Sequence, residues 1–404
     1  MAVTLRDIQD AARALEGQVV CTPVVRANRL SLHLGVDLYL KLENLQHTNA
    51  FKARGALNKL LTLSAAQRAA GVIACSAGNH AQGLAFHAAR LGIPAVIVMP
   101  RPTPFNKVQR TQELGARVVL HGADFDESVG EAHRLAAAEG LTFVHPFADA
   151  AVVAGQGTLG LELMEQLPGV QSVVVPVGGG GLIAGVATAI KGVNPAVEVV
   201  GAQAESYAAA KAFMDGDDGP VAGGATLAEG IAVRAPDAGN LEVIARLVDR
   251  VESAGEAAIE RAIFDLLSAE KLVAEGAAGA GLAVIAQNPK AFCGKQTALI
   301  LCGGNIDSRL LSTLILRGMV REGRIARLTF AIDDTPGQLA GISRLLAEAG
   351  ANVIEVIHQR MMQAVPLKQA ELDIVIEARD RDHVREIVAA LQVSRFKVRV
   401  EEGV

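Results

Sequence analysis

Aromatic residues and net charge are both scarce in this sequence. It contains no tryptophan, two tyrosines and eleven phenylalanines. It has 38 basic and 43 acidic residues, so its net charge is −5. Proteins that bind nucleic acids rely on a basic surface and on aromatic side chains that stack on bases. Because both features are lacking, we expect no nucleic-acid partner.

Cysteines are also few, and their positions share no Cys-x-x-Cys spacing: Cys21, Cys75, Cys293 and Cys302. This spacing indicates neither a zinc site nor a disulfide framework. Residues 1–7 lack the apolar stretch of a secretory signal, so we expect a cytoplasmic location. The uncharged segment 167–190 contains two prolines and four consecutive glycines, which argues against a membrane span.

Short β-branched runs alternate with stretches rich in alanine and leucine. The runs lie at 72–75, 95–99, 117–120, 172–177, 197–200 and 298–301. Nearly all-apolar runs are typical of parallel strands covered on both faces, so the alternation predicts an α/β protein with parallel sheets. Ser64 with Gln67, and Ser253 with Glu256, each have the spacing of a capping box at a helix start.

The composition changes near residue 321. Residues 321–404 hold 25 charged residues in 84, against 56 in the first 320, and the basic stretch 317–327 is the expected linker. The tail pattern predicts strands at 325–332, 352–361, 367–378 and 396–400, with helices at 339–349 and 384–391. This order, βαββαβ, is that of a ferredoxin-like unit.

A lysine lies within the segment 45–56, which has the sequence LQHTNAFKARGA. A lysine beside a ring and small residues, as Lys52 is, can lose hydration and become nucleophilic. The segment equally fits a surface lysine whose aliphatic stem covers apolar neighbours. These residues alone leave both interpretations open.

The segment 75–83, CSAGNHAQG, follows a predicted strand and opens a predicted helix. Free N–H groups at a helix start favour an anion such as a carboxylate, and Ser76 and Asn79 add side-chain donors. The alternative is an ordinary helix start with Ser76 as the N-cap.

Two further predicted strands end in glycines. The segment 176–185, PVGGGGLIAG, suits a phosphate, because glycines let backbone amides approach an anion. It lacks the ending of a Walker loop and the last glycine of a dinucleotide fingerprint. The segment 301–307 is LCGGNID, where Cys302 is either a residue of the crevice at the strand ends or a packed core cysteine.

Together these motifs resemble the serine/threonine dehydratases, which are pyridoxal-phosphate (PLP) enzymes of fold type II. The resemblance is carried by KLENLQ at 41–46, Thr48, FKARGA at 51–56, SAGNHAQG, PVGGGGLIAG and GGNID. It implies a catalytic domain at 1–320 with two open, mostly parallel α/β subdomains, the smaller at about 41–145. The 321–404 tail, with the turn DDTPG at 333–337, resembles an ACT domain, a regulatory module.

The resemblance also implies roles for single residues. Lys52 would hold pyridoxal 5'-phosphate as a Schiff base and act as general base, with Phe51 near the ring and Asn79 on the ring hydroxyl. Gly178, Gly179, Gly180, Gly181 and Leu182 would present amides to the phosphate. Cys302 would face the pyridine nitrogen. The substrate carboxylate would be bound by Ser76, Ala77, Gly78, Asn79 and His80.

The implied activity is dehydrative deamination of L-threonine to 2-oxobutanoate and ammonia, with L-serine to pyruvate as a side activity. The alternatives are a 3-hydroxyaspartate dehydratase, an enzyme of the cysteine-synthase type, a serine racemase-like enzyme, and an inactive amino-acid sensor. Ala77 stands where serine racemases carry a serine, so we expect little racemisation.

Two further expectations concern ligands and assembly. Some relatives bind a cation through a glutamate, a carbonyl and an aspartate; Glu205 and Ala209 match, but Lys211 replaces the aspartate. We therefore expect no metal and hypothesise that Lys211 supplies the charge. The ACT-like tail implies sensing of isoleucine or valine, or a structural dimer contact, and we expect a homodimer or homotetramer.

Overall fold

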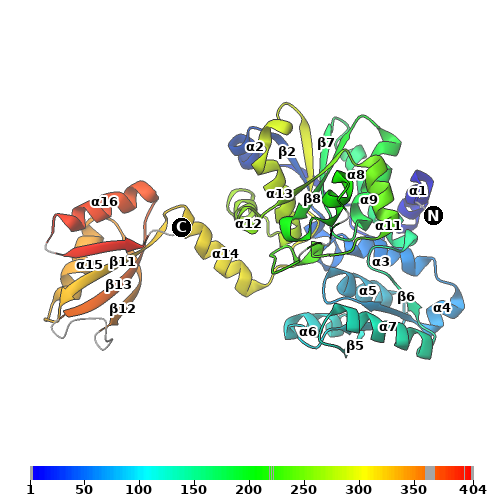
Figure 1. The fold of residues 1–404 in the computed structure, drawn as a ribbon, viewed down its shortest axis with the longest axis horizontal. Helices are drawn as coiled ribbons and strands as arrows, with labels where there is room; N and C mark the ends of the chain where they lie inside the picture. The colour runs from blue at the N-terminus through cyan, green and yellow to red at the C-terminus, as the bar shows by residue number, and fades with distance from the viewer. Residues whose placement is uncertain are drawn as a thin grey trace. The chain divides into compact units, whose positions relative to one another are not determined.

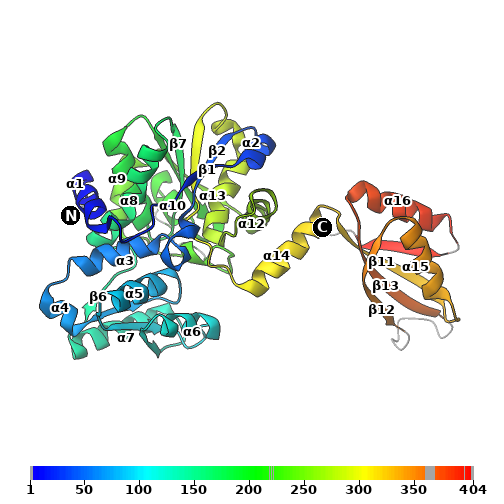
Figure 2. The same ribbon diagram turned by 180° about the vertical axis from the view of Figure 1, so that it is seen from behind.

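The computed structural model describes residues 3–217, 219, 221, 223–359, 369–394 and 396–401. The chain forms two compact units, Met1–Ile306 and Asp307–Val404 (Figures 1 and 2). The sequence-based boundary at 320 falls one helix later, because α14 (Ser308–Arg321) groups with the second unit and contacts its first strand.

The first unit contains a six-stranded sheet with the order β1-β2-β10-β7-β8-β9. Its strands are β1 (Val24–Arg26), β2 (Asp37–Lys41), β7 (Ser172–Pro176), β8 (Glu198–Ala204), β9 (Arg250–Ala254) and β10 (Gln296–Ile300). Only the β1–β2 pair is antiparallel. Every residue of β7 is buried, as expected for a strand covered on both faces.

Helices cover both faces of this sheet. They are α1 (Leu5–Leu15), α2 (Asn28–Leu34), α8 (Ala150–Gln166), α9 (Gly181–Val193), α10 (Ala209–Asp215), α11 (Ala238–Leu247), α12 (Glu256–Glu270) and α13 (Gly276–Gln287). Helix α8 packs on α9, and α12 packs on α13. Figures 1 and 2 show the α8–α9 pair and α13 on opposite faces of the sheet.

A smaller parallel sheet in the same unit has the order β5-β4-β3-β6. Its elements are α3 (Lys52–Leu61), α4 (Ala65–Ala70), β3 (Val72–Cys75), α5 (Asn79–Arg90), β4 (Ala95–Met99), α6 (Phe105–Glu113), β5 (Arg117–Leu120), α7 (Phe125–Glu139) and β6 (Thr142–Phe143). Successive residues of its strands pack into hydrophobic cores on opposite faces of the sheet; in β4, for example, Val96 belongs to one core and Ile97 to the other. Helix α3 contacts both α5 and α8, so it joins the two sheets.

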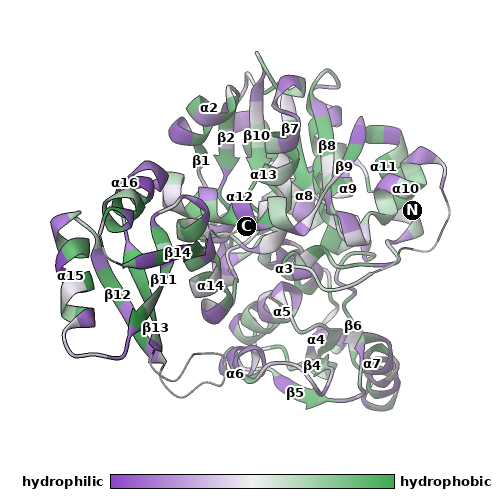
Figure 3. Cartoon of the chain, turned by 60° about the vertical axis from the view of Figure 1, so that its left-hand side comes forward, coloured by the Kyte–Doolittle hydropathy of each residue, from purple (hydrophilic) through white to green (hydrophobic). Residues whose placement is uncertain are grey.

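The second unit has a four-stranded antiparallel sheet with the order β12-β13-β11-β14. Its elements are β11 (Ile325–Asp333), α15 (Gln338–Glu348), β12 (Asn352–Gln359), β13 (Gln369–Glu377), α16 (Arg381–Gln392) and β14 (Lys397–Glu401). The predicted βαββαβ order is confirmed, while the predicted strand ends at 360–361 and 367–368 lie outside the described residues. Figure 3 shows hydrophobic colouring on strands of this sheet, whose buried face includes Leu328, Phe330 and Ile374.

All six predicted strand runs of the first unit are strands, but only one predicted capping box exists. Ser64 and Gln67 form it reciprocally at the start of α4. The box at Ser253 was wrong, because Ser253 pairs with Gln203 of β8 and continues β9, so that α12 begins after Gly255. Within the described residues, none of the helices is both long and apolar enough to cross a bilayer.

Candidate active site

The segment that leads into α3 is joined to the chain at the end of β10. It contains two short 3-10 helices, η1 (Glu43–Leu45) and η2 (His47–Asn49). Backbone hydrogen bonds connect Leu301 N to Lys41 O (2.9 Å), Asn44 N to Leu301 O (3.1 Å), Phe51 N to Cys302 O (3.0 Å) and Gly304 N to Asn49 O (2.9 Å). These bonds place Lys52, the first residue of α3, beside the strand end that carries Cys302.

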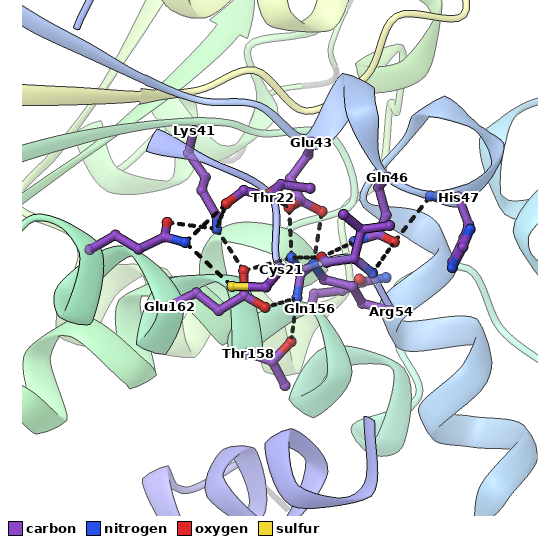
Figure 4. Close-up of polar contacts among 12 residues, drawn as sticks. Cys21, Thr22, Lys41, Glu43, Gln46, His47, Arg54, Gln156, Thr158 and Glu162 are labelled. Carbon is purple, nitrogen blue, oxygen red and sulfur yellow. Dashed lines mark hydrogen bonds and ion pairs between the residues drawn. The ribbon is translucent and has the colours of Figure 1, made fainter. Parts of the chain in front are cut away.

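A buried ion-pair network connects α3 to neighbouring segments of the chain (Figure 4). Arg54 donates to both carboxylate oxygens of Glu43 at 2.8 Å and to Glu162 of α8 at 2.6 Å. Lys41 donates to Glu162 at 2.6 Å and to the Thr22 carbonyl at 2.7 Å. Burial alone would raise the pKa of Glu43, but Arg54 beside it holds that pKa below its ordinary value. Two cations thus balance two carboxylates, and η1, α3 and α8 are tied together.

Lys52 has the surroundings of a reactive amine. Its Nζ donates a 2.7 Å hydrogen bond to the Pro146 carbonyl and lies 5.1 Å from the centre of the Phe51 ring. Burial lowers the pKa of Lys52 from 10.5 to about 8, against the opposing influence of Cys302 and Glu275. With this pKa roughly a tenth of the amine is uncharged at pH 7, against less than about one part in a thousand for an ordinary lysine, and the uncharged form is the one that a nucleophile or base requires.

The four glycines turn the chain from β7 into α9. Gly180 is the N-cap in the left-handed region (φ 87°), where a side chain would be strained. A Cβ on Gly179 would lie 2.3 Å from the Phe147 ring. The loop therefore accepts glycine alone at these positions, and its backbone amides stand at the start of α9, where the helix dipole favours an anion.

One pocket brings all of the predicted cofactor residues together. Its lining includes Phe51, Lys52, Asn79, Gly178, Gly179, Gly180, Gly181, Leu182 and Cys302. Phe147, Ile231 and Val233 add apolar walls. The pocket thus combines an amine, the backbone of a glycine loop at a helix start and apolar walls, and these residues fit pyridoxal phosphate.

The other predicted carboxylate-binding residues, Ser76, Ala77, Gly78 and His80, are not part of this lining. Gly78, rather than Ser76, is the N-cap of α5, and Ser76 Oγ accepts from the Gly78 amide at 3.2 Å. Burial lowers the pKa of His80 to about 3, so its ring is neutral, and Nε2 donates to the Val144 carbonyl at 3.0 Å.

Sequence reasoning missed Glu275, which precedes α13 and lines the pocket. It is 8% exposed, and both its oxygens lie 2.9 Å from Asn79 Nδ2. The Cys302 thiol donates to Glu275 at 3.7 Å, while Asn305 donates to Asn79 Oδ1 at 2.8 Å. The sequence offered one indication, because Glu275 is a single acidic residue directly before the apolar run 276–286.

Burial shifts the acid–base state of this group. It raises the pKa of Glu275 and, together with the neighbouring carboxyl, raises the pKa of Cys302 well above its ordinary value. The thiol therefore stays protonated and donates to Glu275. In the part of the pocket lining that the structure describes, Glu275 is the sole carboxyl group.

The two charged residues considered for the cation site are Glu205 and Lys211. Lys211 forms a 2.6 Å ion pair with Asp215, one turn later on α10, and Glu205 is exposed. Among the residues that the structure describes there is no cluster of three His, Cys, Asp or Glu side chains suited to a metal. The hypothesis that Lys211 supplies a charge in place of the cation stays a prediction.

Comparison with known proteins connects this geometry to a family. The model of the pyridoxal-phosphate dependent enzymes matches residues 15–303. An L-threonine ammonia-lyase of Thermotoga maritima is 45% identical over 399 residues, which cover 98% of this chain and 99% of that protein. An L-threonine ammonia-lyase of Geobacter sulfurreducens is 42% identical, with 95% and 96% covered.

Solved structures agree with the sequence comparison. The processed form of threonine deaminase isoform 2 from Solanum lycopersicum has a TM-score of 0.73 at 33% identity, covering 78% of this chain and 89% of that one. Maize serine racemase has a TM-score of 0.74 at 30% identity, with 79% and 98% covered.

Proposed function

The chain belongs to the family of pyridoxal-phosphate-dependent enzymes, and on that premise we propose that it is an L-threonine ammonia-lyase. It would convert L-threonine to 2-oxobutanoate and ammonia, and L-serine to pyruvate more slowly. The observation that carries this proposal is the pocket in which the Lys52 amine, the glycine loop and the uncharged Cys302 thiol meet. Relatives named for this activity match almost the whole chain, including its second unit.

The pocket residues would divide the binding of the cofactor among them. Lys52 would hold its aldehyde carbon, the amides of residues 178–182 its phosphate, and Cys302 and Glu275 would lie at the edge of its ring. When bound, the cofactor withdraws electrons from the α-carbon of the substrate and makes the α-proton acidic. Because the Cys302 thiol is uncharged and already donates to Glu275, it would leave the ring nitrogen without a full proton.

Lys52 would then serve as the base. Its lowered pKa of about 8 lets the free amine take the α-proton near neutral pH, and the Pro146 carbonyl holds the amine in place through the 2.7 Å hydrogen bond. The β-hydroxyl would depart as water with the proton that Lys52 has taken up, and the released enamine would tautomerise to an imine, which water hydrolyses to the oxo acid and ammonium. The amides at the start of α5 would hold the substrate carboxylate, and apolar Phe147 and Val233 would shield the threonine methyl group.

The test is an oxo-acid assay with L-threonine, L-serine and 3-hydroxyaspartate. We expect kcat/KM to be highest for L-threonine, and both turnover and the visible absorption of the cofactor to disappear in Lys52→Ala. A higher kcat/KM for 3-hydroxyaspartate would make the chain a dehydratase of that substrate instead.

Similarity to maize serine racemase makes racemisation the second candidate function. The serine racemases carry a serine where this chain has Ala77, so the second proton carrier is absent. We expect L-serine to yield pyruvate without appreciable D-serine. Chiral chromatography of the reaction mixture decides the question, and appreciable D-serine would favour the racemase.

For the second unit we propose an ACT-type role in binding isoleucine or valine. The ferredoxin-like strand order supports this proposal. Calorimetric titration with isoleucine and valine, on the full chain and on a chain ending at residue 321, would test it. We expect binding to the full chain alone, and we expect the bound amino acid to change the apparent affinity for threonine. No binding of either amino acid would leave a structural role.

We also propose a homo-oligomer and a cytoplasmic location. Exposed Ile354, Val356 and Ile357 on the edge strand β12 support self-association. All four cysteines are free thiols, which fits a reducing compartment. Size-exclusion chromatography with light scattering would establish the number of subunits.

A further inference from the structure

We propose that Asn240 is a positioning residue for the cofactor phosphate, because it sets the orientation of one peptide group in the glycine loop. Asn240 lies in the first turn of α11 and is 6% exposed. It is not among the residues that line the pocket. Its effect on the cofactor therefore passes through the backbone atoms that its carboxamide binds.

The side-chain amide of Asn240 bridges two backbone carbonyls from distant parts of the chain. Nδ2 donates to Gly179 O at 3.0 Å and to Phe147 O at 2.8 Å, so its two hydrogens have one acceptor each. The turn that carries Asn240 is itself anchored, because Asp237 Oδ1 accepts from the Asn240 backbone amide at 3.0 Å. Asn240 Cβ also lies 2.8 Å from the position that a Cβ on Gly180 would take.

Fixing the Gly179 carbonyl fixes the direction of the next amide. In a planar trans peptide the C=O and the following N–H point in opposite directions, and the described chain has no cis peptide bond. When Asn240 holds the Gly179 carbonyl on the α11 side, the Gly180 N–H points away from α11. Glycine has no Cβ to restrict the rotation of this peptide, so external bonds are needed to hold it. Asn240 Nδ2 supplies the shorter of two, and the Asp237 backbone amide donates to the same Gly179 oxygen at 3.4 Å.

The second acceptor links the same amide to Lys52. Phe147 O is the carbonyl next to Pro146 O, which accepts the 2.7 Å hydrogen bond from Lys52 Nζ. The Phe147 ring also occupies the space beside Gly179. One carboxamide thus holds the phosphate loop and the segment that orients the reactive amine in a single arrangement.

The test compares pyridoxal 5'-phosphate with pyridoxal, which lacks the phosphate. The full-length chain is purified with its cofactor, stripped, and titrated with each compound while the visible absorption is followed. Asn240→Asp keeps the shape and removes the donors, and Asn240→Leu removes all polar groups. We expect both substitutions to raise the dissociation constant of pyridoxal phosphate by about tenfold or more, with that of pyridoxal changing by about twofold or less.

Asn58 provides a matched control. It is also 6% exposed and donates from Nδ2 to a backbone carbonyl, Ala151 O, at 2.7 Å, but it does not contact the glycine loop. Asn58→Leu should lower thermal stability while leaving the ratio of the two dissociation constants unchanged. A merely structural role for Asn240 would give the same result as this control.

Three outcomes would overturn the proposal. One is an equal loss of affinity for both compounds, and another is unchanged affinity in folded Asn240 variants. The third is a failure of all variants to fold, including Asn240→Ser, which leaves room for water; Asn240 would then serve stability alone. The inference rests on the cofactor and not on the proposed substrate, so a failure to deaminate threonine would not affect this measurement.

Discussion

Replacing Lys52 by methionine should stabilise the cofactor-free protein while abolishing cofactor binding. Partial burial in the pocket removes part of the hydration of the Lys52 amine and lowers its pKa from 10.5 to about 8. Below pH 8 the amine is charged in both the folded and the unfolded chain, and the folded state carries the cost of burying that charge. Methionine has a similar length and carries no charge, so the cost disappears.

The size of the effect follows from the lowering of the pKa. Each pKa unit corresponds to about 1.4 kcal/mol, so a fall from 10.5 to about 8 gives an upper limit of about 3 kcal/mol. Lys52 is only half-buried, and water in the pocket screens part of this energy. We therefore expect Lys52→Met to raise the free energy of unfolding by about 1–3 kcal/mol at pH 7.

The dependence on pH distinguishes this cause from better packing. Between pH 8 and 10.5 the unfolded chain binds more protons than the folded one, so stability rises with pH in the wild-type protein. The advantage of Lys52→Met should therefore shrink across this window. Urea unfolding of both cofactor-free proteins at several pH values measures it. A constant difference, or a wild-type protein that is the more stable at pH 7, would refute the reasoning.

Three more predictions concern the ion-pair network and the Glu275 group. Arg54→Met leaves Lys41 as the one cation beside Glu43 and Glu162, and it should lower the free energy of unfolding in urea by about 3–5 kcal/mol. The control Arg13→Met, at an exposed ion pair, should lower it by less than about 0.5 kcal/mol. Equal losses would contradict a role for the network. Burial raises the pKa of Glu275, so the folded protein carries a cost for the charged carboxylate, and Glu275→Gln should leave the melting temperature unchanged or higher. The same substitution should lower kcat/KM at least about tenfold and alter the visible spectrum of the cofactor. Full activity would exclude a functional Glu275. Cys302→Ser should keep kcat/KM within about tenfold, since a hydroxyl is also uncharged and can donate to Glu275, while a larger loss than in Cys302→Ala would rule this out.

The elements that the sequence predicted correctly are those that local patterns encode. Runs such as 72–75 became strands because nearly all-apolar residues can be covered on both faces of a sheet. The capping box at Ser64 formed because its two hydrogen bonds lie within four residues. The same motif failed at Ser253, where pairing with Gln203, distant in the sequence, extends β9 instead.

The candidate site divides in the same way. Lys52, the glycines and Cys302, which line one pocket, were predicted from short motifs that resemble those of the family. Glu275 and Asn240 were not, since Asn79 and Glu275 are 196 residues apart and the acceptors of Asn240 are 61 and 93 residues away.

The sequence by itself therefore determined the strands and the chemical groups available for catalysis, since backbone periodicity and motif chemistry act over a few neighbouring residues. Only the tertiary structure decided that burial lowers the pKa of the Lys52 amine, that the Cys302 thiol donates to Glu275, and that Asn240 donates to the Gly179 carbonyl. The burial of a side chain and hydrogen bonds between residues distant in the sequence exist only in the folded chain.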